Sequence, residues 1–392
     1  MSWEVKKLSD CCVSIADGDH QAPPKADFGI PFVTISDINV YNQFDFTDTM
    51  FVPREYYDRL DNKRKAQKGD VLYSVVGSFG IPVYMKETVP FVFQRHIAIL
   101  RPNDTILPQF LYYTMLSRDF YMMADAAALG AAQRTVSLTA LRNIRISVPP
   151  MDAQKKIVDT LSAYDTLIEN NQKQIKLLEE AAQRLYKEWF VDLRFPGHEN
   201  TKITDGIPEG WKIQTLSQIA DVVMGQSPKS EFYNQNGQGL PFHQGVGSYG
   251  TRFVVDKIYS TSFTRIAEAG SILFSVRAPV GRLNLTRNRV VIGRGLAAIN
   301  HRLGKQSYLF YLLKEHFFKD DVIGNGAIFA SISKDELLAQ QFTIPVSNLI
   351  EQFNVIVSDM DERIAELAEQ VTLLIEARDR LLPKLMSGEI EV

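Results

Sequence analysis

Two long segments of the chain, residues 151–195 and 348–392, carry an apolar residue at every seventh position in two registers each. A double apolar seam sustained for about four heptads predicts a coiled-coil helix. The obvious partner for each predicted helix is the other one. The seam residues expected to form this interface, or to contact a partner protein, are Leu161, Ile168, Ile175, Leu178 and Leu185 in the first segment, and Ile364, Leu367, Val371, Leu374 and Leu381 in the second.

Polar residues interrupt both seams. Asn171 and Arg378 occupy seam positions, where a polar side chain typically fixes the helix register at some loss of stability. They could equally face a partner protein. Pro383 lies near the end of the second segment, where we expect the helix to kink or stop.

The remainder of the chain is an internal duplication, which is the most informative feature of the sequence. The offset between matched positions falls from 208 residues, at Trp3 and Trp211, to 196, at Pro149 and Pro345, as loops of unequal length would produce. The matched runs are residues 3–9 with 211–217, 68–75 with 269–276, 95–100 with 294–299, and 130–137 with 324–331.

Each repeat reads as a mixture of short strands and a few helices. Short β-branched runs such as residues 31–35, bounded by Gly, Pro and Asp, predict strands. The aromatic runs 110–116 and 308–314 predict helices that belong to the core rather than to a site. The predicted fold class is therefore α+β, with two β-rich domains joined by two long helices. We expect domains at residues 1–150 and 196–347, and helices at 151–195 and 348–392.

The order of these segments constrains the helix pair. Each helix begins directly after its own domain, and the link 195–209 is short and rich in turn residues. The second helix should therefore run back along the first, giving antiparallel helices with one domain at each end and a two-fold relation between the repeats. A helix of about 40 residues is roughly 60 Å long.

The distribution of charged residues along the chain is more informative than the overall composition. The chain has 392 residues and a net charge of −3, and its adjacent Cys11 and Cys12 suit neither a disulfide framework nor a zinc site. No secretory signal or membrane span is predicted, so a cytoplasmic location is expected. The run between Glu268 and Glu315 contains no carboxylate but eight Lys and Arg residues. Such a run suits a phosphate-facing surface, or equally a solvated face.

Motifs for catalysis are not found. The sequence has no Asn/Asp-Pro-Pro-Tyr/Phe element for adenine methylation, no Gly-x4-Gly-Lys-Ser/Thr phosphate loop and no His-Glu-x2-His zinc pair. We therefore expect no catalytic residue, no metal site and no cofactor in this chain.

The order domain, helix, domain, helix resembles the specificity subunit of type I restriction–modification systems over essentially the whole length. The motifs that carry this resemblance are residues 149–157 and 187–195 of the first helix region, and residues 351–352 and 381–390 of the second. One departure is Ala153, where the family usually has Glu. The resemblance implies two target-recognition domains, each reading one half of a split sequence in double-stranded DNA. It also implies that the helices dock two methyltransferase subunits, and that motor-nuclease subunits join for restriction. Adenine methylation and ATP-dependent cleavage would then belong to those partners.

Candidate DNA-binding residues lie on the polar loops of the two repeats. Base edges call for Arg, Asn, Gln, Ser or Thr on loops, and phosphates call for Lys, Arg and backbone amides. The predicted residues are His20, Gln21, Lys25, Ser78, Arg95, Gln133, Arg134 and Thr135 in the first repeat, and Gln226, Ser227, Lys229, Gln244, Arg252, Arg277 and Arg294 in the second. The alternative is a scaffold whose two β-rich domains bind protein or sugar instead of DNA.

Overall fold

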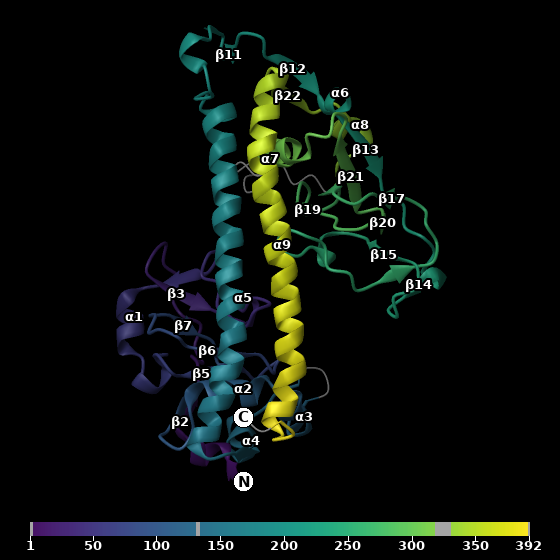
Figure 1. Cartoon of the computed structure of the whole chain (residues 1–392). Helices are drawn as coiled ribbons and strands as arrows, with labels where there is room; N and C mark the ends of the chain where they lie inside the picture. Colours follow the sequence, from purple (N-terminus) through teal and green to yellow (C-terminus); the bar gives the residue numbers. More distant parts are fainter. Residues whose placement is uncertain (1–2, 131–133, 318–330, 391–392) are drawn as a thin grey trace. The chain divides into compact units, whose positions relative to one another are not determined.

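The computed structural model, which describes residues 3–130, 134–317 and 331–390, forms two compact units (Figure 1). Unit 1 consists of Met1–Asn170 and Gln370–Val392, and unit 2 consists of Asn171–Glu369. Helices α5 (Met151–Tyr186) and α9 (Ser347–Met386) contribute to both units. Each unit therefore contains one repeat and a length of both long helices. Within the described ranges, no helix is long and apolar enough to span a membrane.

Unit 1 is built on a four-stranded antiparallel sheet in the order β2-β8-β5-β6. The central strands carry near-continuous apolar runs because both of their faces are covered, and all four residues of β5 are buried. These strands are β2 (Cys12–Asp17), β5 (Val71–Ser74), β6 (Pro82–Tyr84) and β8 (Ile97–Pro102).

Two smaller sheets and four short α-helices complete the part of this unit that the structure describes. Strands β3 (Ile30–Val33), β4 (Met50–Val52) and β7 (Val92–Phe93) form one sheet, in which β3 and β7 are parallel. Strand β1 (Glu4–Lys7) pairs with β9 (Arg145–Val148). The helices are α1 (Arg54–Arg59), α2 (Pro108–Leu116), α3 (Arg118–Ala126) and α4 (Leu138–Asn143).

Unit 2 repeats this plan with strands of its own. Its four-stranded sheet runs β13-β21-β18-β19, and β15 is parallel to β20 in a second sheet that also contains β14, β16 and β17. The strands of the first sheet are β13 (Ala220–Met224), β18 (Ile272–Ser275), β19 (Leu283–Leu285) and β21 (Leu296–His301). Those of the second are β14 (Tyr233–Asn234), β15 (Leu240–His243), β16 (Tyr259–Ser260), β17 (Ile266–Ala267) and β20 (Val290–Ile292).

The remaining elements of unit 2 frame these sheets. A short hairpin of β10 (Ile203–Thr204) and β11 (Ile207–Pro208) lies in the link that follows α5. Strand β12 (Lys212–Thr215) pairs with β22 (Gln341–Ile344), as β1 pairs with β9. The short helices are α6 (Leu216–Ile219), α7 (Gln306–Phe317) and α8 (Lys334–Leu338).

Strand register confirms the internal repeat residue by residue. Ser74 lies opposite Ile97 in unit 1, and the matched Ser275 lies opposite Leu296 in unit 2. Both serines also close the following turn with the same two hydrogen bonds. The Ser74 hydroxyl donates to the Ser78 carbonyl and accepts from the Ile81 amide, and Ser275 does the same with Pro279 and Arg282.

The aromatic helices lie in the core, as predicted. Six consecutive residues of α2, from Phe110 to Met115, are buried, and so are six of α7, from Tyr308 to Leu313. A helix that is apolar all round needs cover on every side. In unit 1 the sheet and the long helices supply it, because Tyr73, Phe110, Leu161 and Leu382 belong to one core.

The long helices are antiparallel in both units, which confirms the predicted pairing. In unit 1 the first part of α5 packs against the end of α9, through Leu161, Leu382 and Leu385. In unit 2 the last part of α5 packs against the beginning of α9, and Ile175 contacts Ile364 and Leu367. Of the predicted seam residues, Leu161, Ile168, Ile175, Ile364, Leu367 and Val371 are buried, and Leu178, Leu185, Leu374 and Leu381 are half-buried.

The polar interruptions behave differently from one another. Arg378 donates to Asp165 of α5 at 2.8 Å, so this pair ties the two helices together within unit 1. Asn171 is buried. Pro383 lies inside α9, which ends at Met386, so the helix continues only a few residues beyond it.

Gln154 fixes the start of α5 to the globular part of unit 1. Its side chain is buried and makes three hydrogen bonds to backbone groups. The Gln154 oxygen accepts from the Leu107 amide at 2.8 Å, and its nitrogen donates to the carbonyls of Pro149 and Thr105 at 2.9 and 3.2 Å. This side chain therefore joins the beginning of the long helix to the segment that leads into α2.

The substitution Gln154→Ala should lower the free energy of unfolding by about 2 kcal/mol, because it removes a buried side chain and leaves the half-buried Leu107 amide without its acceptor. Thermal unfolding followed by circular dichroism measures this change. Gln352→Ala is the matched control, since Gln352 is exposed near the start of α9. Equal melting temperatures for the two variants would contradict the proposed role of Gln154.

Candidate nucleic-acid interface

Four loops of unit 1 meet at the ends of its strands and form what we call loop cluster 1, residues 17–21, 74–80, 94–96 and 134–137. Backbone hydrogen bonds join them. The Arg95 amide donates to the Asp19 carbonyl at 3.0 Å, and the Val75 amide donates to the His96 carbonyl at 2.8 Å. The Gly77 amide donates to the Arg134 carbonyl at 3.0 Å. Loops far apart in the sequence are thus held as one surface.

Unit 2 holds the matching loops in the same way, as loop cluster 2, residues 225–229, 243–245, 275–281, 292–295 and 331–332. The Gln226 amide donates to the Ile292 carbonyl at 2.9 Å, and the Val276 amide donates to the Gly295 carbonyl at 2.9 Å. The Arg294 amide donates to the Ser227 hydroxyl at 3.2 Å. The two clusters are therefore two copies of one arrangement with different side chains.

A glycine permits the close approach of loops in each cluster. A Cβ atom added at Gly18 would lie under 3.0 Å from the Phe93 and Gln94 carbonyl oxygens. At the matched Gly225, it would lie under 3.0 Å from the carbonyl oxygens of Ile292 and Gly293. Glycine is thus required here for close backbone packing.

Loop cluster 1 combines acidic and basic groups around a small pocket of about 300 Å³, lined in part by Asp17, Arg95, His96 and Thr135. The Asp17 carboxylate contacts His20 at 2.6 Å. Burial, together with the charge of Arg95, lowers the pKa of His96. Arg95 is exposed and forms no ion pair with any residue that the structure describes. Its guanidinium is therefore available to a ligand.

Loop cluster 2 is more basic. Arg277 and Arg294 are exposed, and neither forms an ion pair within the described part of the chain. The matching loop after β13 carries the neutral Gln226 and Ser227 where unit 1 has Asp19 and His20. The carboxylate-free run identified in the sequence therefore reaches the loop surface of this unit.

Most of the predicted DNA-binding residues are brought together by these clusters. Gln21 and Ser78 are exposed on cluster 1, and Thr135 is half-buried. Arg134 also lies there, but its guanidinium pairs with Asp125 at 3.1 Å. Gln244 is exposed on cluster 2. Gln133 lies outside the described residues.

Of the two predicted lysines, Lys25 lies beyond the residues that define cluster 1, and Lys229 is the last residue of the 225–229 loop of cluster 2. Lys25 and Lys229 are both exposed, and Lys229 is 3.9 Å from Glu231. The hydrogen bonds described above, which hold each cluster, do not involve them. Their positions suit phosphate contacts better than base contacts.

Arg252 does not lie on the exposed loop surface. It is 4 % exposed, donates to Asp361 of α9 at 2.5 Å and stacks on the Phe310 ring at 3.8 Å. The sequence placed it among DNA-contacting cations because its loop is polar. Its buried position instead gives it a role within unit 2.

Sequence reasoning did not single out Arg64 and Tyr56, which contact the acidic residues of cluster 1. Arg64 lies 3.7 Å from Asp17 and 4.0 Å from Asp19. The Tyr56 hydroxyl donates to Asp19, and burial together with this hydrogen bond raises the pKa of Tyr56 to about 12. No sequence signal marked these contacts, because both residues come from a segment some 40 residues away from the loop.

The chain is thus a duplicated α+β protein. Each copy is followed by a long helix and presents exposed Arg and Gln side chains on clustered loops. The family described as "Type I restriction modification DNA specificity domain" matches residues 1–180 and 208–377. The chain belongs to this family, which confirms the resemblance found in the sequence.

Relatives extend over the whole chain. A putative type I restriction enzyme MjaX specificity subunit from Methanocaldococcus jannaschii is 30 % identical, over 100 % of this chain and 94 % of its own length. The MjaIX specificity subunit of the same organism is 25 % identical over the same shares. The crystal structure of a type I restriction–modification S subunit from M. genitalium shares the fold, with a TM-score of 0.56, 16 % identity, and coverage of 98 % of this chain and 96 % of that one.

Replacing Gly18 or Gly225 by Ala should destabilise the corresponding unit by about 1–3 kcal/mol, because the added methyl group forces the packed backbones apart. Urea unfolding measures the change. Gly247→Ala provides a control on an exposed loop, since a Cβ atom there would meet nothing within 4 Å. If all three variants unfolded at the same urea concentration, close packing at the two glycines would not be required.

Proposed function

We propose that the chain reads a split DNA target, with loop cluster 1 contacting one half and loop cluster 2 contacting the other. The observation that carries this proposal is that the repeat places an exposed arginine at the same position in both clusters, and that neither arginine forms an ion pair with a residue in the described ranges. Arg95 precedes β8 in unit 1, and Arg294 precedes β21 in unit 2. Two copies of one binding surface on a single chain suit a target in two parts.

The side chains of the clusters supply both kinds of contact that DNA recognition needs. Arginine can bind the O6 and N7 atoms of guanine with two hydrogen bonds, and Gln can bind the N6 and N7 atoms of adenine. We assign these roles to Arg95, Arg294, Gln226 and Gln244. Exposed lysines and backbone amides would hold the phosphates and set the register without reading sequence.

The two halves of the target should differ in sequence. In cluster 1, Asp17 is half-buried, Asp19 is buried, and both are engaged with Arg64, whereas the matching positions of cluster 2 hold the neutral Met224 and Gln226. A carboxylate only accepts hydrogen bonds, for example from the N4 amino group of cytosine, and it repels phosphate, whereas a neutral amide both donates and accepts and does not repel phosphate. Different donors and acceptors on one backbone arrangement therefore favour different base sequences.

We further propose that the long helices dock two methyltransferase subunits, and that motor-nuclease subunits join this assembly. Exposed leucines on the helices suit such docking, because water-exposed apolar groups favour burial against a partner. Leu167 and Leu177 of α5 are 50 % and 54 % exposed, and Leu373 of α9 is 57 % exposed. Adenine methylation, DNA translocation and cleavage would be performed by those partners.

The decisive experiment is long-read detection of modified bases in DNA from cells that express this chain together with its methyltransferase subunit. A split motif with a fixed gap, lost when this chain is omitted, is the expected result. If an active methyltransferase left no such motif, the scaffold alternative would gain support. In that case the purified chain should also lack the steep loss of DNA affinity with rising salt that phosphate contacts produce.

Arg95→Ala should weaken recognition of one half of the target only, and Arg294→Ala should weaken recognition of the other. Each substitution removes about 1–3 kcal/mol of base discrimination, and little stability, because both side chains are exposed. Competition binding with targets mutated in one half at a time measures this. The control is Arg134→Ala, whose side chain already pairs with Asp125. Loss at both halves from a single substitution would contradict the two-reader proposal.

Removing one heptad from both long helices, at facing positions, should change the gap and leave the bases read in each half unchanged. Seven helical residues span about 10 Å, which is roughly three base pairs of duplex DNA. A set of targets with gaps of different length measures the preferred spacing. A variant that kept the original gap, or that changed the bases read, would show that the helices do not act as a spacer.

A further inference from the structure

Each unit contains a tyrosine from its aromatic helix that contacts an aspartate on a long helix. In unit 1 the Tyr113 hydroxyl donates to Asp165 at 2.6 Å, and in unit 2 the Tyr311 hydroxyl donates to Asp361 at 3.3 Å. The repeat relates both pairs, because Tyr113 and Tyr311 occupy the same place in α2 and α7. Each aspartate also binds an arginine, but the two arginines lie on different kinds of element.

In unit 1 the arginine belongs to the helix pair. Arg378 of α9 binds Asp165 of α5, so this ion pair joins one long helix to the other. In unit 2 the arginine belongs to the recognition domain. Arg252 lies on the loop between β15 and β16 and binds Asp361 of α9 at 2.5 Å. The ion pair of unit 2 therefore joins a domain loop directly to the long helices.

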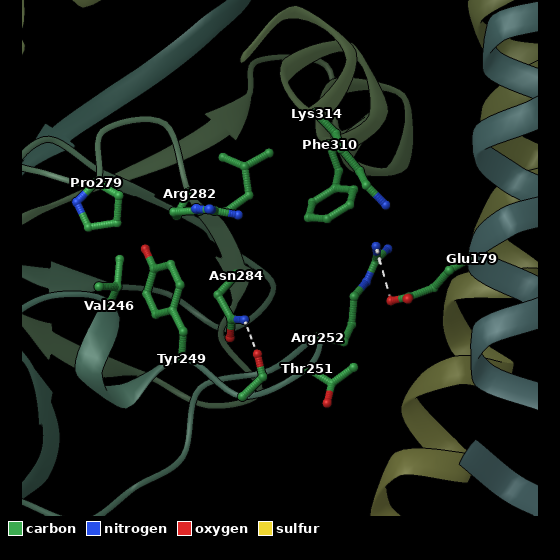
Figure 2. A pocket seen from close by; sticks show the side chains of 12 residues that line it. Glu179, Val246, Tyr249, Thr251, Arg252, Pro279, Arg282, Asn284, Phe310 and Lys314 are labelled. Atoms are coloured by element: carbon green, nitrogen blue, oxygen red, sulfur yellow. Dashed lines mark hydrogen bonds and ion pairs between the residues drawn. The ribbon is translucent and has the colours of Figure 1, made fainter. Parts of the chain in front are cut away.

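Arg252 is held from several sides. It stacks on the Phe310 ring, and its second terminal nitrogen lies 3.8 Å from Glu179 of α5. Figure 2 shows it directed toward Glu179, at the edge of a pocket of about 390 Å³ lined also by Tyr249, Asn284 and Lys314. The neighbouring Phe253 packs on the cluster of Ile175, Ile364 and Leu367. Arg252 and Phe253, which lie beside this pocket, thus connect the loop to the two long helices.

The same loop also reaches the DNA-facing surface. At its beginning, the Gln244 carbonyl accepts from the Gly295 amide at 3.1 Å, next to Arg294. At its end, the Arg252 carbonyl accepts from the Leu285 amide at 3.0 Å. Between these points, the Tyr249 hydroxyl donates to the Leu273 carbonyl at 3.0 Å. Only seven residues, 245–251, separate Gln244 at the base-reading end from Arg252 at the helix-binding end.

We propose that Arg252 is a positioning residue that sets the orientation of loop cluster 2 on the long helices, and thereby the spacing and fidelity with which the second half of the target is read. This inference rests on the proposed two-part recognition. A buried arginine that binds a carboxylate and stacks on an aromatic ring defines one orientation more sharply than apolar contact does, because both interactions are directional. No contact between Arg252 and DNA is required.

The test compares Arg252→Met with Arg378→Met in the full chain, assembled with its methyltransferase subunit. Methionine keeps apolar volume and removes the charge. Because removing one partner of a buried ion pair leaves the other charge uncompensated, thermal unfolding first checks that both variants fold. Binding is measured with targets mutated in the first half, targets mutated in the second half, and targets whose gap is one base pair shorter or longer.

Arg252→Met should reduce discrimination at the second half about tenfold and relax the gap preference, while discrimination at the first half stays within about twofold of the parent. Arg378→Met should lower stability without changing the ratio between the halves. Arg252→Lys, which keeps the charge but lacks the planar fork, should fall between parent and Arg252→Met.

Two outcomes would overturn the proposal. A folded Arg252→Met variant with parental discrimination and gap preference would show that Arg252 does not position the loop. Equal losses at both halves, as expected for general destabilisation, would do the same. If the parent chain itself showed no split target, the proposed function would fail instead, and this result would be seen before any variant was compared.

Discussion

The buried aromatic helix of each unit is the constraint on which the rest of the structure depends. Helices α2 and α7 carry six consecutive buried residues, and such a helix is stable only when it is covered on every side. In unit 2 the four-stranded sheet covers one part, through residues such as Phe274, and the long helices cover another, through Tyr186 and Phe353. Domain and helix segments consequently share one core. Within each unit, the loop cluster is therefore carried on a core that includes segments of the long helices.

This shared core explains why the repeat is conserved in its framework but not in its surface. The serines that close the turns, the glycines that allow close packing and the tyrosine–aspartate contacts occur in both units, because each of them fixes backbone geometry. Exposed side chains on the loops, such as Gln21 and Gln226, are not part of this framework. The framework can thus be kept while the chemistry of each loop surface changes.

Much of this organisation could be predicted because it is periodic or repeated. The heptad seams located the buried faces of both helices, and the duplication gave the order of elements, including the core position of the aromatic helices. The strand order could not be derived, because the parallel pairs β3–β7 and β15–β20 join segments far apart in the sequence. Arg252 was assigned to the DNA surface for the same reason, since its partner Asp361 is 109 residues away. A polar loop around a cation looks alike in sequence whether the cation faces solvent or a buried carboxylate.

The difference in charge between the two clusters assigns them different shares of the proposed recognition. Salt-dependent affinity grows with the number of phosphates that cations neutralise, whereas base discrimination depends on directed hydrogen bonds. Cluster 2 exposes Arg277 beside the proposed base-reading Arg294, in a run that contains no carboxylate, so phosphate attraction adds to its base contacts. In cluster 1, Asp17 and Asp19 offset much of the positive charge, so binding there gains less from phosphates and depends more on fit to particular bases. A mismatch in the half read by cluster 1 would then lower affinity more completely, because less sequence-independent attraction remains to hold the DNA.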